Sequence, residues 1–153
     1  MSGFPRLNIV LYQPEIPQNT GNISRTCVAI NARLWLIRPL GFDLSEKRVR
    51  RAGLDYWPHL DLRVCDNWTH FLQQANPTRC WFLTKKASHN VYDVQFDPND
   101  FLVFGSETRG LPDDILETHA ANTLRIPTTE NVRSLNLSNA VAIVAYEAVR
   151  QLS

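Results

Sequence analysis

Short apolar runs rich in β-forming residues alternate with helix-like stretches along this chain, and that alternation constrains its fold more than any other sequence feature. The apolar runs lie at Leu7–Tyr12, Leu34–Ile37, Leu62–Cys65, Cys80–Thr84, Phe101–Phe104 and Thr123–Ile126. Helical patterns separate most of them, at residues 18–31, 45–53, 67–76, 112–119 and 136–151. Strands that alternate with helices form a parallel sheet covered on both faces. We therefore predict the α/β class, with a loop over residues 86–100.

The composition narrows the class of protein further. At 153 residues the chain suits a single domain, expected to span residues 1–153, and 44% hydrophobic residues suffice for a core. Sixteen Lys and Arg against fifteen Asp and Glu exclude a histone-like polycation, so any contact with nucleic acid must come from local clusters. No apolar run approaches the roughly 20 residues that cross a bilayer. We expect a cytoplasmic protein without membrane contact.

The cysteines and histidines do not form a recognisable framework. Cys27, Cys65 and Cys80 are odd in number and widely spaced, without a CxxC pair, which argues against a disulfide scaffold or a zinc site. The four histidines show no mutual spacing typical of metal ligands; they are His59, His70, His89 and His119. We therefore expect no metal and assign the histidines no function.

The last predicted helix has two partly apolar rows. Its first row follows the spacing of a core-facing stripe and comprises Leu137, Ala140, Val141, Val144, Ala145, Ala148, Val149 and Leu152. A second row holds Asn139, Ile143, Tyr146 and Arg150, and is half apolar where a surface helix should be polar. Either a partner subunit or a loop of the same chain would cover this second row.

Polar loops follow three of the predicted strands, at the edge where parallel sheets bind ligands. In the first, over residues 14–25, Asn19 or Thr20 is expected to cap the next helix, on which Asn22, Arg25 and Thr26 share one face. Arg25 on that face either contacts a ligand or only faces solvent.

The second loop, Gly105–Pro112, has glycines at Gly105 and Gly110 that permit a positive φ or a close backbone approach. It lacks a phosphate-binding lysine, because Leu111 stands at that position, and it is not a GxGxxG loop. The bare pattern fits a plain strand-to-helix turn as well as a ligand loop.

The third loop precedes the last helix, where Ser134 or Asn136 is the expected N-cap. Its further Asn and Ser side chains exceed what capping needs, next to a helix N-terminus that favours polar ligands. Separately, residues 46–51 carry four cations and one anion; a solvated charged surface is the usual explanation for such a run, and contact with phosphate is the alternative.

Taken together and in this order, four blocks resemble the SPOUT superfamily of S-adenosylmethionine-dependent RNA methyltransferases. Within it they are similar to the small tRNA (cytidine/uridine) 2′-O-methyltransferases that modify the wobble nucleotide. The blocks are Asn8–Asn22, Arg48–Tyr56, Phe104–Pro112 and Arg133–Val141. Ser106 departs from the pattern, since many relatives have proline there.

The resemblance implies a homodimer with a trefoil knot near the C-terminus, S-adenosylmethionine as cofactor and tRNA as substrate. It implies cofactor contacts at Leu83, Gly105, Glu107, Gly110, Ile126, Ser134 and Leu135. Arg25 would be the catalytic or substrate-orienting arginine, assisted by Ser134 and Asn136. RNA contacts are expected at Arg25, Lys47, Arg48, Arg50, Arg51 and Tyr146.

Three other functions are alternatives to methylation of the wobble nucleotide. The chain could methylate the 2′-hydroxyl of another RNA site, or it could be a non-catalytic RNA-binding dimer that has kept the fold. A flavodoxin-like nucleotide-binding module is disfavoured, because no glycine-rich phosphate loop follows the first strand.

Overall fold

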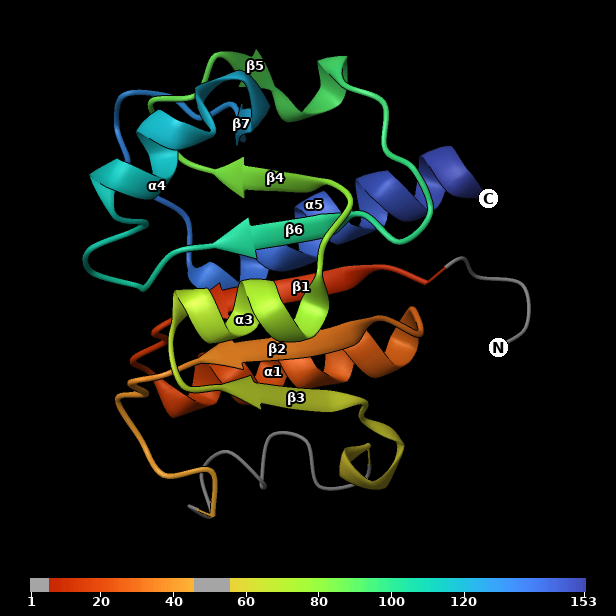
Figure 1. The fold of residues 1–153 in the computed structure, drawn as a ribbon. Helices are drawn as coiled ribbons and strands as arrows, with labels where there is room; N and C mark the ends of the chain where they lie inside the picture. Colours follow the sequence, from red (N-terminus) through yellow and green to blue (C-terminus); the bar gives the residue numbers. More distant parts are fainter. Residues whose placement is uncertain (1–5, 46–55) are drawn as a thin grey trace.

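The computed structural model describes residues 6–45 and 56–153 and contains one seven-stranded, fully parallel sheet (Figure 1). The strands are β1 (Asn8–Tyr12), β2 (Arg33–Ile37), β3 (Leu62–Cys65), β4 (Cys80–Leu83), β5 (His89–Asn90), β6 (Phe101–Phe104) and β7 (Thr123–Arg125). Their order in the sheet is β3-β2-β1-β6-β4-β7-β5. This confirms the predicted α/β class and all six predicted strands.

Helices cover both faces of the sheet. The helices within the described residues are α1 (Pro17–Ala29), α3 (Trp68–Ala75), α4 (Asp113–Thr118) and α5 (Leu137–Leu152). Short 3₁₀ turns occupy Trp57–His59, Val91–Asp93 and Ala120–Asn122. Figure 1 shows α1 and α5 behind the sheet and α3 and α4 in front of it.

Two apolar cores lie on the two faces, because successive residues of a strand point in opposite directions. In β1, Ile9 and Leu11 join the core beneath α1 and α5, whereas Val10 joins the core beneath α3 and α4. The expected stripe of α5 is confirmed, since most of its residues belong to the first of these cores. On α1, Ile23, Cys27 and Ile30 are fully buried there.

The structure corrects the sequence prediction in one segment and leaves another outside its range. The expected loop over residues 86–100 contains the two-residue strand β5, which pairs with β7, and a 3₁₀ turn. A strand this short is beyond the reach of a periodicity argument. The helix expected at residues 45–53 lies outside the described residues, except for Ser45.

Three neighbouring strands, β6, β4 and β7, end beside one another at the carboxyl edge of the sheet. β4 pairs with β6 on one side and with β7 on the other, with Phe82 opposite Val103 and Leu83 opposite Leu124. This register brings Leu83, Gly105 and Ile126 to one edge, although they are far apart in the sequence. The N-terminus of α5 lies at the same edge (Figure 1).

Candidate functional site

The residues expected to hold a cofactor come from the loops at this carboxyl edge. Leu83, Ile126 and Leu135 are half-buried, and the first two pack against the core beneath α1 and α5. Gly110 and Ser134 are exposed. The edge therefore combines aliphatic surface with open backbone and hydroxyl groups.

The Glu107 carboxylate joins the loop after β6 to the segment that begins α1. It accepts hydrogen bonds from the backbone N–H groups of Glu15 and Ile16, at 2.8 Å each, and from Nδ2 of Asn19 at 3.1 Å. Both carboxylate oxygens thus have partners within the protein. The side chain braces two loops that are more than 80 residues apart in the sequence.

Glu15 returns this interaction in the opposite direction. Its Oε1 accepts hydrogen bonds from the Thr108 hydroxyl at 2.7 Å and from the Thr108 backbone N–H at 3.0 Å. The Thr108 hydroxyl, followed by the Thr108 backbone N–H, lowers the pKa of Glu15 below its ordinary value. The two loops are therefore held by a reciprocal pair of carboxylates.

The same network reaches the N-terminus of α5. Asn136 donates from Nδ2 to Oδ1 of Asn19 at 3.1 Å, and its own Oδ1 accepts from the backbone N–H groups of Ser138 and Asn139. Asn136 is thus the N-cap of α5, as one of the two sequence alternatives stated. Ser134 forms no hydrogen bond with any residue in the described part of the chain, so its hydroxyl is open to a ligand.

The start of α1 differs from the prediction that Asn19 or Thr20 caps it. The helix begins at Pro17, and its N-cap is Ile16, whose side chain supplies no hydrogen bond. Proline suits the first helical position because its fixed φ is helical and it has no N–H to satisfy. The Glu107 carboxylate accepts from the backbone N–H of this N-cap residue, Ile16, and the Asn19 side chain donates to the same carboxylate instead of capping the helix.

The two glycines of the second loop serve the two purposes expected of them. A Cβ on Gly105 would stand 2.1 Å from the carbonyl carbon of Gly110, so the loop folds back onto its own backbone there. Gly110 has φ +67° with open space around it, a left-handed conformation that glycine adopts readily.

Arg25 lies on the exposed face of α1, as expected from its spacing with Asn22. Its guanidinium stands 4.8 Å from the ring centroid of Tyr56, a cation–π contact. Within residues 6–45 and 56–153 it has no ion pair, so its donor groups are open. The sequence did not predict a role for Tyr56, although this residue ends one of the four matching blocks.

Apart from Arg25, the expected RNA-binding residues are the basic run 47–51 and Tyr146. Lys47, Arg48, Arg50 and Arg51 lie outside the described residues. Tyr146 is 48% exposed on α5, and Ile143 beside it is half-buried, so no loop in the described part of the chain fully covers this second row of the helix.

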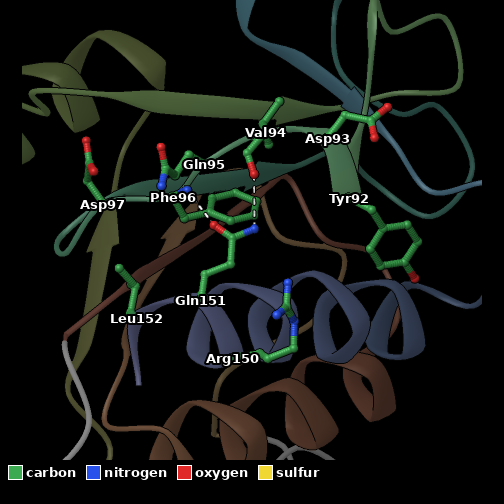
Figure 2. Close-up of a pocket in the computed structure, with 9 residues that line it drawn as sticks. All are labelled: Tyr92, Asp93, Val94, Gln95, Phe96, Asp97, Arg150, Gln151 and Leu152. Atoms are coloured by element: carbon green, nitrogen blue, oxygen red, sulfur yellow. Dashed lines mark hydrogen bonds between the residues drawn. The ribbon is translucent and has the colours of Figure 1, made fainter.

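A groove of about 780 Å³ lies at the opposite edge, near the C-terminus of α5 (Figure 2). Its lining comprises residues 92–97 and 150–152. Gln151 spans it by donating to the Val94 carbonyl and accepting from the Phe96 N–H. Because these bonds join α5 to the segment before β6, the groove serves the packing of the fold.

The described residues contain neither a cluster of metal-ligating side chains nor a membrane-spanning helix. Across residues 6–45 and 56–153, no three His, Cys, Asp or Glu side chains gather as metal ligands would. No helix of the same residues is long and apolar enough to cross a membrane.

Comparison with known proteins agrees with this architecture. The model of the SpoU rRNA Methylase family matches residues 6–146. A tRNA (cytidine(34)-2′-O)-methyltransferase of Saccharophagus degradans is 52% identical over 146 residues, which cover 95% of each protein. A solved structure concerned with the 2-OH methylation of C/U34 on tRNA superposes with a TM-score of 0.92 at 48% identity, over 97% of each chain.

A more distant relative was solved with a molecule bound to it. An AdoMet-bound rRNA methyltransferase from Sinorhizobium meliloti superposes with a TM-score of 0.86 at 25% identity, over 99% of this chain and 60% of the other. The resemblance recognised from four sequence blocks is thus confirmed over nearly the whole length. This chain belongs to the SpoU rRNA methylase family.

Proposed function

We propose that this protein methylates the ribose 2′-hydroxyl of nucleotide 34 in tRNA, a cytidine or a uridine, with S-adenosylmethionine as the methyl donor. The observation that carries the proposal is full-length correspondence with proteins of that reaction, at 52% identity in sequence and a TM-score of 0.92 in structure. Methylation of another RNA site, or RNA binding without catalysis, would leave this correspondence unexplained.

The carboxyl edge fits the proposed cofactor by its chemistry. Leu83, Ile126 and Leu135 offer half-buried aliphatic surface for a purine ring, and the loops around Gly105 and Gly110 offer backbone groups for polar atoms. S-adenosylmethionine carries no phosphate, which agrees with the absence of a phosphate-binding loop in the sequence. When bound, it supplies a methyl group already activated on a positively charged sulfur.

The residues of the chain must then orient a ribose hydroxyl that is protonated at neutral pH. Arg25 is a poor base, because a guanidinium keeps its proton up to a pKa above about 12. In our proposal Arg25 binds the phosphate beside the target ribose, and that phosphate or a water accepts the hydroxyl proton. Such positioning can contribute about 7–11 kcal/mol to the lowering of a barrier.

The hydrogen bonds distinguish the roles of the remaining polar residues. Ser134 has an unengaged hydroxyl and is our candidate for the contact with the ribose oxygen. Asn136 and Glu107 already satisfy their side chains within the protein, so we assign them the positioning of the loops that carry Ser134 and Arg25.

The remaining features follow from the same proposal. One domain over residues 1–153 carries the trefoil knot near its C-terminus and forms a homodimer that covers Ile143 in the second row of α5. RNA contacts extend from Arg25 to the basic run 47–51 and to Tyr146. The protein works in the cytoplasm, on tRNA, without a metal.

Mass-spectrometric mapping of ribose methylation in tRNA tests the proposal. Cells lacking the gene should lose the 2′-O-methyl group at nucleotide 34, and the purified protein with S-adenosylmethionine should restore it to that tRNA. Complementation with Arg25→Ala is the control for catalysis. Loss of a mark at another RNA position would replace the proposed substrate. A wild-type protein that binds tRNA without transferring a methyl group would overturn the enzymatic function.

A further inference from the structure

The cations of the described residues sort by edge of the sheet. Five arginines lie at the amino edge or beside it, near the C-terminus of α5, and each forms an ion pair. The pairs are Arg6, Arg33 and Arg63 with Asp61, Arg79 with Asp97 and Asp100, and Arg150 with Glu147. Four carboxylates face these five arginines, so most of their positive charge is neutralised within the protein.

At the carboxyl edge, four exposed cations behave differently. Lys85, Lys86, Arg125 and Arg133 form no ion pair and no side-chain hydrogen bond with residues 6–45 or 56–153. Of the other cations at this edge, Arg38 is paired with Asp66 at the end of β2, and Arg109 interacts electrostatically with Glu15 in the loop after β6. We call the four unpaired cations the carboxyl-edge basic surface.

The fold gathers this surface from two neighbouring strands and a loop. Lys85 and Lys86 lie in the turn after β4, Arg125 is the last residue of β7, and β4 and β7 are paired. The Thr84 N–H donates to the Leu124 carbonyl at 2.9 Å, which holds the two strand ends together. Arg133 follows in the loop that leads to α5.

Each member also lies within three residues of a proposed cofactor contact. Lys85 follows Leu83 by two positions, Arg125 directly precedes Ile126, and Arg133 directly precedes Ser134. A substrate that approached the methyl donor would therefore pass these cations.

The local charge favours an anionic partner. Segments 84–86 and 125–134 carry four cations and one anion, Glu130, a net charge of +3 in a chain whose total is +1. Glu130 forms no ion pair with the described residues. Unpaired lysines and arginines on an exposed edge are what binding to a phosphate backbone requires.

We propose that the carboxyl-edge basic surface binds backbone phosphates of the RNA substrate beside the methylated nucleotide. This inference rests on the proposed function and adds to it a set of phosphate contacts distinct from the basic run 47–51. Its partner is an RNA strand rather than a free nucleotide, because the cations are spread over two strand ends and a loop.

Binding of an unmodified tRNA transcript at several salt concentrations tests this inference. The variants are Lys85→Gln with Lys86→Gln, and Arg125→Gln with Arg133→Gln. Each double variant should bind tRNA roughly 10- to 50-fold more weakly near 0.1 M salt, and its log–log salt slope should be shallower by about 1.5, since each lost phosphate contact removes about 0.7–0.9 from the slope.

A matched control removes two charges from the opposite edge. Arg6→Gln with Arg63→Gln changes side chains that are 38% and 53% exposed and leaves Asp61 paired with Arg33, and it should leave tRNA affinity within about twofold of wild type. The affinity for S-adenosylmethionine, measured by calorimetry, reports on the integrity of the carboxyl edge and should be unchanged in all variants.

Three results would overturn the inference. If the carboxyl-edge variants bind tRNA as the control does, the surface has no role, and methylation by the wild type would leave the proposed function intact. If their affinity for S-adenosylmethionine falls in parallel, these residues act through the cofactor site. A wild-type protein that binds no tRNA would remove the surface together with the proposed function.

Discussion

Arg25 is exposed on α1, and its substitution separates a role in orienting the substrate from a role in proton transfer. Arg25→Lys keeps a cation and should retain part of the single-turnover rate, whereas Arg25→Ala should lose about 10²-fold or more, by analogy with other misplaced substrates. The acidic limb of the pH–rate curve should not move in Arg25→Lys. A shifted limb would assign Arg25 to proton transfer instead.

Tyr56 should act on the reaction through Arg25. Exposed cation–π contacts contribute about 0.5–1 kcal/mol, so Tyr56→Leu should lower kcat/KM by roughly two- to fivefold. Tyr56→Phe keeps the aromatic ring and serves as the matched control, with little expected change. If Tyr56→Leu has no additional effect in an Arg25→Ala background, the two residues act together; independent effects would contradict this account.

Glu107 offers a test of the brace between loops. In the wild type, the Glu107 carboxylate accepts hydrogen bonds from N–H groups on both of its oxygens. Glu107→Gln replaces one of these oxygens by an amide NH₂ group, which is itself a donor, and should therefore reduce the free energy of unfolding by about 1–3 kcal/mol. Urea denaturation measures this loss. The control is Glu117→Gln, an exposed glutamate of α4 without a hydrogen bond to the described residues. Equal stability of the two variants would show that the brace is energetically unimportant.

At the scale of an element, the turn between β6 and α4 depends on two glycines for different reasons. Gly105→Ala places a Cβ against the backbone of Gly110 and Leu111, at 2.1 and 2.3 Å, and should cost about 3 kcal/mol or more because backbone must move. The Cβ of Gly110→Ala would have open space around it, so the only penalty is the left-handed backbone conformation. We expect this substitution to lower the free energy of unfolding by about 1–2 kcal/mol. Thermal unfolding of the pair tests the order; a costlier Gly110→Ala would contradict it.

The ends of the helices show where local sequence signals were sufficient. The cap of α5 follows from Asn136, a good N-cap residue directly before an apolar helix. The N-cap of α1 could not be found in this way, because Ile16 supplies no side-chain hydrogen bond and its backbone N–H donates to Glu107 in a distant loop. A partner about 90 residues away leaves no trace in the spacing of the helix itself.

For the molecule as a whole, several carboxylates with lowered pKa values make the free energy of unfolding depend on pH in the acid range. Hydrogen bonds from Arg150 lower the pKa of Glu147, and those from Thr108 lower that of Glu15. Burial acts to raise the pKa of Asp61, but hydrogen bonds from Arg33 and Arg63 outweigh it and lower the value.

A folded-state pKa below the unfolded one adds stability above the unfolded pKa, and this stability is lost as the pH falls through the folded pKa. We therefore expect the urea midpoint to be constant near neutral pH and to fall once the pH drops below about 4.5, the ordinary pKa of glutamate. Glu147→Gln should flatten the decline. A midpoint that rises on acidification would contradict the assignment.

The parallel α/β sheet, the core stripe of α5 and the family could all be predicted before the coordinates were known, because periodicity, turn residues and four matching blocks are local signals. Which polar side chains are already hydrogen-bonded became clear from the folded chain alone: Glu107 and Asn136 bond across loops, whereas Ser134 and Arg25 have open donors. The folded chain also separates paired arginines at the amino edge from unpaired cations at the carboxyl edge. Pairing depends on distances between residues that are remote in sequence, and parallel strands bring them together only when the sheet forms.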